Sequence, residues 1–300
     1  MDVVTGAFSF TGKYIAARLL ALEHEVRTLT RHKQSASPFG DSVRACPLDF
    51  GDPQGLRRAL TGADTLYNTY WIRSPRGAVT FERAVANTRV LLAAAREAGV
   101  RRVVQISVSN ASASSPLAYF RGKALADEAL VASGLSHAIV RPTLIFARED
   151  VLVNNIAWLL RRLPLFVIPG DGRYTLQPVA VEDVARLSVD AAGADERQAS
   201  DAAGPDVFTF EELVSLVRNA VGSKARFVHA GLDFANGLGA LLGAVLRDTL
   251  ITRAELQGLM ANLLTSSAPP TGERRFADWL SANASDLGAS YTSERRRNWS

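Results

Sequence analysis

The chain has few of the residues that mark several common classes of protein. Its 300 residues include one cysteine, Cys46, so an intramolecular disulfide is excluded and a reducing, cytoplasmic location is expected. The four histidines are scattered without the spacing of a metal site. The longest apolar run, GLGALLGAVL, has about 10 residues, fewer than the ~18 that cross a bilayer. The chain enters an apolar strand pattern at once, so no signal peptide is expected.

A large excess of charge is also lacking. The net charge is +4, and the basic excess is local, in the segment SERRRNWS. No basic stripe interleaves with aromatic residues, so nucleic-acid binding is not expected. A composition of 47% hydrophobic and 21% charged residues is typical of a globular protein with a packed core.

The first half of the chain alternates apolar strand patterns with helical ones. Strands are predicted at DVVTGA, HEVRTLTR, DTLYNTY, RRVVQISVS and SHAIVRP. Helices are predicted after the first strand, at DPQGLRRAL, over residues 78–98 and at PLAYFRGKALADEALVAS. This alternation predicts a doubly wound, parallel α/β sheet of the Rossmann type, with helices on both faces.

The pattern changes after residue 146. Residues 147–300 carry helical segments and two capping boxes, Thr209 with Glu212 and Thr252 with Glu255. The prediction is therefore a dinucleotide-binding domain at 1–146, to which segment 178–193 returns, and a smaller, mostly helical substrate domain at 147–300. The aromatic and aliphatic side chains of this second domain favour a small apolar or aromatic substrate.

A glycine turn joins the first strand to the first helix. Gly6 suits the tight turn, and Gly12 allows close packing of helix on sheet, while Ser9 replaces the glycine usual in the middle. The helix N-terminus offers free N–H groups to a phosphate, and the Ser9 hydroxyl can add a hydrogen bond. The residues expected around a dinucleotide pyrophosphate are Gly6, Phe8, Ser9, Phe10, Thr11 and Gly12.

The end of the second strand discriminates between NAD and NADP. An acidic residue there would bind the ribose 2′-hydroxyl of NAD. Here the strand runs into Thr30, Arg31, His32 and Lys33, and the two permanent cations favour a 2′-phosphate. NADP is the predicted cofactor, with NAD the alternative.

Several segments together resemble the short-chain dehydrogenase/reductase superfamily. The likeness is to its extended and atypical members, the NAD-dependent epimerase/dehydratase-like and NmrA-like proteins, which include the Rossmann-type accessory subunit of respiratory complex I. The matching segments are TGAFSFTG, LDFGD, YNTYW, REAGVRRVVQISVSN, YFRGK, IVRPTLIF and QPVAVEDVA, in the family's order.

The resemblance implies a role for individual residues. Asp49 resembles the residue beside the adenine amino group, with Phe50 next to the ring. Asn68 and Thr69 resemble the stretch that follows the phosphate and ribose, and Pro142 and Thr143 the turn that passes the nicotinamide. Ser109, Tyr119 and Lys123 resemble the catalytic serine, tyrosine and lysine, with Ser107 as the alternative serine.

The chemistry of these side chains is coherent. Tyr119 and Lys123 are four residues apart, so they share one face of a helix. A lysine cation favours the phenolate, which makes tyrosine a better acid–base catalyst near neutral pH. Lys123 can also bind the nicotinamide ribose, and Ser109 can donate to a substrate carbonyl. The chain has four lysines among its 34 basic side chains, and one of them stands here.

Two departures from the family pattern leave the function open. Ala84 stands where some relatives have a catalytic asparagine, and Ala147 where many have glycine. The first hypothesis is an NADP(H)-dependent oxidoreductase acting on a small carbonyl or quinone-type substrate, or an epimerase with bound nicotinamide. The alternative is a non-catalytic NADP(H)-sensing regulator or structural subunit. The oligomeric state is not readable from the sequence.

Overall fold

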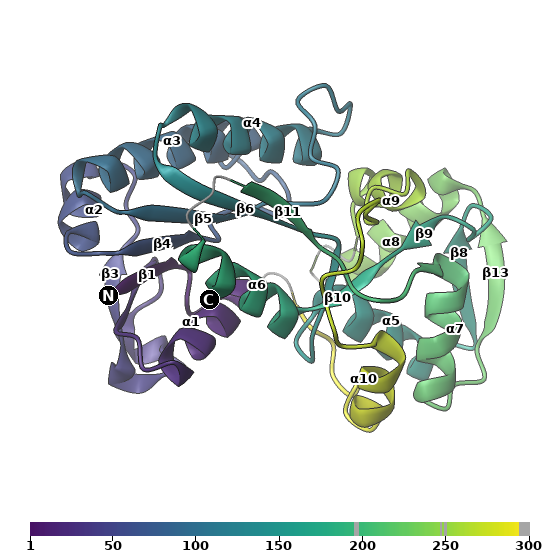
Figure 1. Cartoon of the computed structure of the whole chain (residues 1–300). Helices are drawn as coiled ribbons and strands as arrows, with labels where there is room; N and C mark the ends of the chain where they lie inside the picture. The colour runs from purple at the N-terminus through teal and green to yellow at the C-terminus, as the bar shows by residue number, and fades with distance from the viewer. Residues whose placement is uncertain (195–197, 247, 249–250, 294–300) are drawn as a thin grey trace. The chain divides into compact units, whose positions relative to one another are not determined.

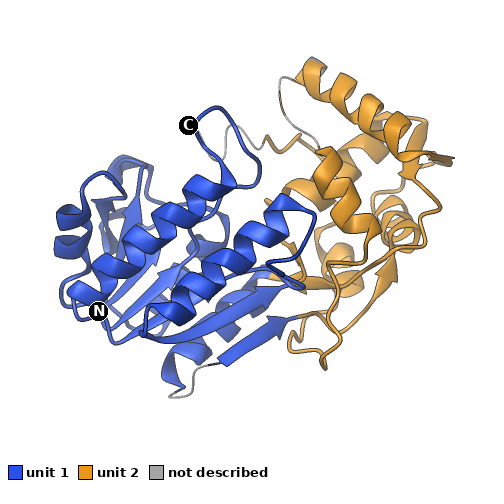
Figure 2. Cartoon of the chain, turned by 90° about the horizontal axis from the view of Figure 1, so that it is seen from above, with its two compact units in different colours: residues 1–142, 181–202 blue, residues 143–180, 203–300 orange. Residues whose placement is uncertain are grey.

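The computed structural model describes residues 1–300 except 195–197, 247, 249–250 and 294–300. The basic segment at the end of the sequence falls almost entirely outside the described residues. The described chain divides into two compact units, 1–142 with 181–202 and 143–180 with 203–300 (Figure 2). The first part of this unit thus ends at residue 142, four residues before the expected boundary at 146. The segment that returns to the unit is 181–202, whereas 178–193 was expected.

The first unit is built on a seven-stranded sheet in which all strands are parallel, in the order β11-β6-β5-β4-β1-β2-β3 (Figure 1). The strand order reverses between β1 and β4, the switch point at which such sheets bind ligands. The strands are β1 (Asp2–Thr5), β2 (Val26–Thr30), β3 (Val43–Pro47), β4 (Thr65–Asn68), β5 (Arg102–Ile106), β6 (Ser136–Pro142) and β11 (Gln198–Ala202).

Helices cover both faces of this sheet, so the predicted Rossmann-like α/β fold is confirmed. In Figure 1, α2, α3 and α4 lie on one face, and α1 and α6 on the other. The helices are α1 (Phe10–Ala21), α2 (Pro53–Leu60), α3 (Phe81–Glu97), α4 (Ala118–Ala132) and α6 (Val181–Gly193), with short 3₁₀ turns η1 (Gln34–Ala36) and η2 (Gly40–Ser42). Val3, Leu66 and Val103 of the sheet are buried with Leu91 of α3 in one apolar cluster, which anchors the strand ends that carry the site.

Local signals set the helix ends. Asp52 caps α2 by accepting from the N–H of Gly55, with Pro53 at the first helical position. After α3, Gly99 has a φ of +74°, a left-handed conformation that terminates a helix and that glycine adopts without strain.

The seventh strand, β11, was not predicted. Its sequence QASDA is polar, and its first three residues are exposed, because it lies at the edge of the sheet against β6 alone. Without apolar alternation, an edge strand of this kind gives no period-2 signal.

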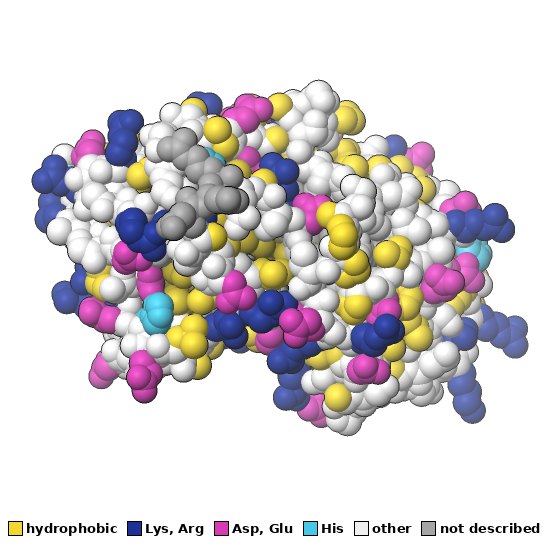
Figure 3. All heavy atoms as spheres, viewed as in Figure 1, with side chains coloured by type: hydrophobic (Ala, Val, Ile, Leu, Met, Phe, Trp, Pro, Cys, Tyr) yellow, Lys and Arg dark blue, Asp and Glu magenta, His cyan; other side chains and the backbone are white. Residues whose placement is uncertain are grey.

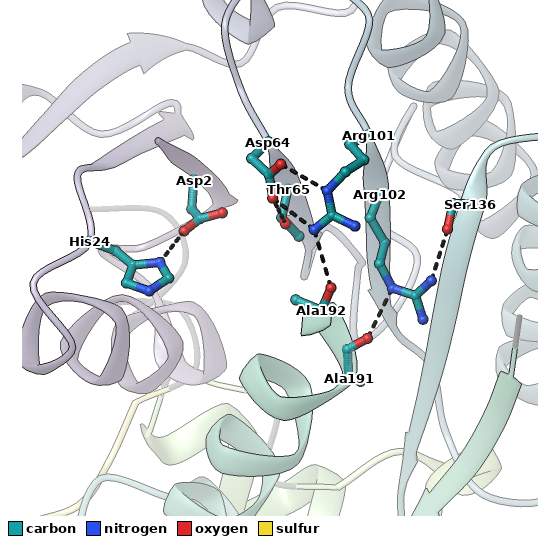
Figure 4. Close-up of polar contacts among 9 residues, drawn as sticks. All are labelled: Asp2, His24, Asp64, Thr65, Arg101, Arg102, Ser136, Ala191 and Ala192. Atoms are coloured by element: carbon teal, nitrogen blue, oxygen red, sulfur yellow. Dashed lines mark hydrogen bonds and ion pairs between the residues drawn. The ribbon is translucent and has the colours of Figure 1, made fainter. Parts of the chain in front are cut away.

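Arg101 and Arg102, at the amino end of β5, both donate to carbonyls at the end of α6 (Figure 4). The Arg102 side chain is fully buried and donates to the carbonyl of Ala191 and the hydroxyl of Ser136, at 2.9 and 2.8 Å. Arg101 binds both carboxylate oxygens of Asp64, and this pairing lowers the pKa of Asp64. The guanidinium of Arg102 thereby satisfies a carbonyl at the negative end of the helix, which holds segment 181–202 in the unit.

The second unit combines helices with small two-stranded sheets. Its core gathers Phe146, Leu176, Leu213 and Phe276. The helices are α5 (Val151–Arg162), α7 (Phe210–Ala220), α8 (Leu232–Leu246), α9 (Arg253–Met260) and α10 (Phe276–Asn283); the paired strands are β7 (Leu144–Phe146) with β10 (Pro178–Ala180), β8 (Leu165–Pro169) with β13 (Arg226–Ala230), and β9 (Thr175–Leu176) with β12 (Phe208–Thr209).

Both predicted capping boxes are confirmed, at the starts of α7 and α9. The apolar run GLGALLGAVL lies in α8, where Phe234 and Leu241 are exposed. Among the described helices, none has the length and apolar character needed to cross a membrane. Lysine and arginine side chains are interspersed with acidic ones on the face that Figure 3 shows.

Candidate functional site

The turn between β1 and α1 has the close backbone approach of a phosphate-binding turn. Gly6 has a φ of +67°, and its carbonyl accepts from the N–H of Ser9 at 2.8 Å. A Cβ at Gly12 would lie 2.3 Å from the Gly6 carbonyl oxygen, so no larger residue fits there without moving the backbone. Both glycines are therefore structural requirements of this turn.

The first turn of α1 follows the glycine turn directly. Ser9 is the N-cap residue, with extended backbone, but within the described chain its hydroxyl makes no capping bond. Helix α1 has 12 residues, and its first N–H groups carry the positive end of the helix dipole. The neighbouring Phe8, Phe10 and Thr11 are half-buried. This arrangement fits a pyrophosphate, and Ser9 remains able to donate to it.

The loop after β4 is tied to the same turn. The hydroxyl of Thr69 donates to the carbonyl of Thr5, and the Thr69 N–H donates to the Thr5 hydroxyl at 2.7 Å. A Cβ on Gly6 would lie 3.5 Å from the Thr69 hydroxyl. Thr69 therefore borders the glycine turn.

The expected adenosine-binding residues lie at the ends of β2 and β3. Arg31 and Lys33, directly after β2, are exposed. Asp49, after β3, is exposed and accepts from the N–H of Gly51. Phe50 packs on Tyr70 with ring centroids 4.7 Å apart.

An open groove lies beside Asp49. It is bordered by β3 and α2, has a volume of about 450 Å³, and is lined in part by Cys46 and Asp52.

The Tyr70 hydroxyl accepts from the Asn87 side chain of α3 at 2.8 Å. Asn87 is on the helix where an asparagine was sought at position 84, but its partner is Tyr70.

Tyr119 and Lys123, both on α4, contact the indole ring of Trp71. The Lys123 Nζ lies 4.9 Å from the centre of the Trp71 ring, and the Tyr119 ring meets Trp71 edge-on at 6.4 Å. The Phe81 ring stacks against the Trp71 ring, with ring centroids 6.1 Å apart. A Cβ at Gly122 would lie 3.1 Å from the indole, so the glycine within YFRGK gives Trp71 its place against the helix.

Lys123 is a buried cation. Its ammonium donates to the carbonyl of Ile106 at 2.7 Å, and the residue is 5% exposed. Burial lowers the pKa of Lys123 to about 8, while the negative charge of Asp127 opposes the decrease. The group is therefore poised to change its charge close to physiological pH.

The two serines after β5 have different contacts. The Ser107 hydroxyl donates its proton to a hydrogen bond with the Asp127 carboxylate of α4, at 2.7 Å. Ser109 is fully buried, and its backbone N–H donates to the carbonyl of Pro142 at 2.9 Å. Pro142 therefore adjoins the expected catalytic serine.

Asp127 is the group that sequence reasoning missed. Its carboxylate accepts from Gln105 at 2.8 Å as well as from Ser107, and Arg141 lies 3.5 Å away. Gln105 in turn accepts from Asn68 at 3.1 Å. The available signal was its spacing: Tyr119, Lys123 and Asp127 recur every four residues, which places them on one helix face.

Of the expected residues, Tyr119 and Lys123 lie on α4, and Phe10, Thr11 and Gly12 open α1, while the others lie at or after the carboxyl ends of strands. Thr143 is the first residue of the second unit, and its hydroxyl donates to the carbonyl of Gln177. Asn68 is buried with its side chain engaged in the sheet. No cluster of metal-ligating side chains occurs in the described ranges.

Comparisons with known proteins agree with this geometry. Residues 6–157 match a family described as NAD(P)H-binding. The chain is 27% identical to the mitochondrial NADH dehydrogenase [ubiquinone] 1 alpha subcomplex subunit 9 of Arabidopsis thaliana, over 79% of this chain and 62% of that protein. It thus spans under two thirds of that relative, and the resemblance to the complex I accessory subunit is confirmed.

Two further likenesses are to reductases. A (4-alkanoyl-5-oxo-2,5-dihydrofuran-3-yl)methyl phosphate reductase of Streptomyces griseus is 27% identical over 95% of this chain and 98% of that protein. The structure of Citrobacter sp. triphenylmethane reductase complexed with NADP(H) matches with a TM-score of 0.76 at 17% identity, over 95% of this chain and all of that one. Other structures of this fold are complexes with NAD.

Proposed function

The chain belongs to the NAD(P)H-binding family, and on that premise we propose that it is an NADP(H)-dependent oxidoreductase acting on a small, apolar or aromatic carbonyl or quinone-type substrate. The observation that carries the proposal is the placement of Tyr119 and the buried Lys123 cation around Trp71. A buried ammonium and a phenol that contact the same indole from one helix face fit acid–base catalysis better than surface solvation.

Each side chain has a role in this proposal. Tyr119 delivers the proton to the substrate oxygen during reduction, and Lys123 favours its phenolate after that transfer. Ser109 donates a hydrogen bond to the same oxygen, because Ser107 is committed to Asp127. When bound, the nicotinamide supplies or accepts the hydride.

The glycine turn and the ends of β2 and β3 would hold the cofactor. The N-terminus of α1 and the Ser9 hydroxyl would bind the diphosphate. Arg31 and Lys33 supply positive charge for a 2′-phosphate, and Asp49 an acceptor for the adenine amino group. Pro142 and Thr143 are proposed to border the nicotinamide, and Lys123 to hold its ribose.

A titration tests the cofactor assignment. NADPH should bind more tightly than NADH, and Arg31→Ala should lose most of that preference, since a charge-assisted contact contributes on the order of 1.5–3 kcal/mol. Arg89→Ala, an exposed arginine on α3, is the matched control. Equal affinities in the unmodified protein, or an unchanged preference in Arg31→Ala, would contradict the NADP assignment.

The catalytic role is tested by turnover. NADPH absorbance is followed with panels of carbonyls and quinones, and Tyr119→Phe should cut the rate by about 10² to 10⁴ while NADPH affinity stays nearly constant. Tyr67→Phe, at a buried tyrosine of β4, controls for loss of a hydroxyl elsewhere. A Tyr119→Phe protein with the unmodified rate would sink the assignment of Tyr119.

A second candidate is a non-catalytic NADP(H)-binding subunit or sensor. The likeness to a complex I subunit and Ala84 in place of the expected asparagine favour it. If NADPH binds tightly, no substrate of either panel is reduced, and the nucleotide alters association with another protein, this candidate replaces the first.

A further inference from the structure

A chain of side-chain hydrogen bonds runs from Asn68 of β4 through Gln105 of β5 to Asp127 of α4. The backbone N–H of Tyr70 donates to Asn68 Oδ1 at 3.2 Å, so the Asn68 amide points toward Gln105. Gln105 Oε1 accepts that amide, which leaves its own Nε2 to donate to Asp127 Oδ1 at 2.8 Å. Because a backbone donor fixes the first link, the orientation of both amides is determined.

Asp127 ends this chain as an acceptor of several hydrogen bonds. Besides Gln105, it accepts from Ser107 at 2.7 Å, and the Arg141 guanidinium lies at 3.5 Å. The residue is 4% exposed. Burial raises the pKa of Asp127, and the bonds from Ser107 and Gln105 and the charges of Lys123 and Arg141 favour its carboxylate form.

Asp127 also follows Lys123 by one helical turn on the buried face of α4. Tyr119 and Asp127 share the face of α4 that carries Lys123, and α4 also carries Arg121 and the exposed Glu128. The neighbouring strands carry Arg102 on β5, which is bonded to Ala191 and Ser136, and His137 and Arg141 on β6. The charged side chains of α3, which packs on α4, are exposed. Of the described groups, Asp127 is the one whose charge acts on the lysine.

We propose that Asp127 is a positioning residue: its fixed, buried carboxylate is the counter-charge that keeps Lys123 an ammonium and that holds Ser107 away from the reacting atoms. The effect on turnover rests on the proposed function, whereas the effect on Lys123 ionisation does not. An uncharged residue at position 127 would leave Lys123 with a backbone carbonyl and an aromatic face as its partners.

The ionisation of Lys123 can be measured without any substrate. The chain has four lysines, so NMR of protein labelled with ¹³C at lysine Cε resolves few signals, and Lys123→Met assigns the one of interest. In the unmodified protein its midpoint should lie at about pH 8. Asp127→Asn should lower that midpoint by about one pH unit, roughly a tenfold loss of the ammonium form.

Matched variants separate charge from packing. Ser107→Ala removes one bond to the same carboxylate but keeps the charge, so the midpoint should move far less. Asp127→Glu, which restores the charge, should restore most of the shift. The double variant Asp127→Asn/Ser107→Ala removes the conflict between the new amide and the serine donor, and it supplies the measurement if Asp127→Asn does not fold.

The outcomes distinguish this proposal from the proposed function. A Lys123 midpoint that is unchanged in the asparagine variants, even with lower stability, would overturn the positioning role and leave Asp127 as a structural residue. A shifted midpoint in a protein that reduces no carbonyl or quinone would uphold the positioning role and contradict the oxidoreductase. With an active protein, Asp127→Asn should shift the pH profile of NADPH affinity by the same amount as the Lys123 midpoint.

Discussion

Replacing Lys123 by methionine should change the pH dependence of stability by a predictable amount. The pKa of this lysine falls from 10.5 to about 8 on burial. A lysine with a depressed pKa contributes stability that is present above the unfolded pKa and is lost as the pH falls through the folded one. The wild-type protein should therefore gain stability relative to Lys123→Met as the pH rises from 7 toward 10.5.

The size of this gain follows from the two pKa values. For one group titrating at 10.5 unfolded and at about 8 folded, the difference between pH 7 and pH 10 is about 2.5 kcal/mol. The lost hydrogen bond to Ile106, roughly 1–3 kcal/mol with a buried acceptor left unpaired, is the same at both pH values. The loss of this hydrogen bond therefore adds a constant to the stability difference between the two proteins and does not change how that difference varies with pH.

Urea unfolding at pH 7 and pH 10 measures the effect. Comparing variant with wild type at each pH cancels the titration of every other group. Lys224→Met, at an exposed lysine, should show no change in its stability difference between the two pH values. If the difference for Lys123→Met were also independent of pH, Lys123 would not be a desolvated cation, and the reasoning about its role would be wrong.

Three other substitutions test the architecture of the site. Gly12→Ala should cost at least about 2 kcal/mol of stability and abolish NADPH binding, because its Cβ meets the Gly6 carbonyl at 2.3 Å; denaturation and titration measure both. Gly122→Ala should leave stability nearly unchanged, since about 1 kcal/mol of helix propensity offsets the crowding of Trp71, but it should lower turnover. Arg102→Met should cost about 2–3 kcal/mol in urea unfolding, because buried partners of the guanidinium lose their donor.

The sequence predicted the sheet and the glycine turn after β1 because their signals are local. Asp52 with Pro53, and Gly99 after a long amphipathic segment, mark helix ends through the conformations that those residues adopt. Gly6 and Gly12 could be assigned for the same reason: only glycine permits the backbone approach that the structure contains.

The remaining features depend on contacts distant in sequence. The polar strand Gln198–Ala202 pairs with β6, and no alternation of its own residues indicates this. Asp127 looked like an ordinary helical carboxylate until Gln105 and Ser107, about 20 residues earlier, were seen to donate to it. Similarly, the hydrogen bond of the Ser107 hydroxyl to Asp127 could not be read from the sequence around either residue.

Deuterium transfer tests the central claim, that Tyr119 and Lys123 form a hydride-transfer site served by NADPH, most directly. NADPH that carries deuterium at both hydrogen positions of nicotinamide C4 is incubated with the protein and the panels of carbonyls and quinones, and the products are analysed by mass spectrometry. With the unmodified protein, a reduced carbonyl product should carry one deuterium, and Tyr119→Phe and Lys123→Met should form far less of it. Tight NADPH binding with no labelled or reduced product from either panel would contradict the claim.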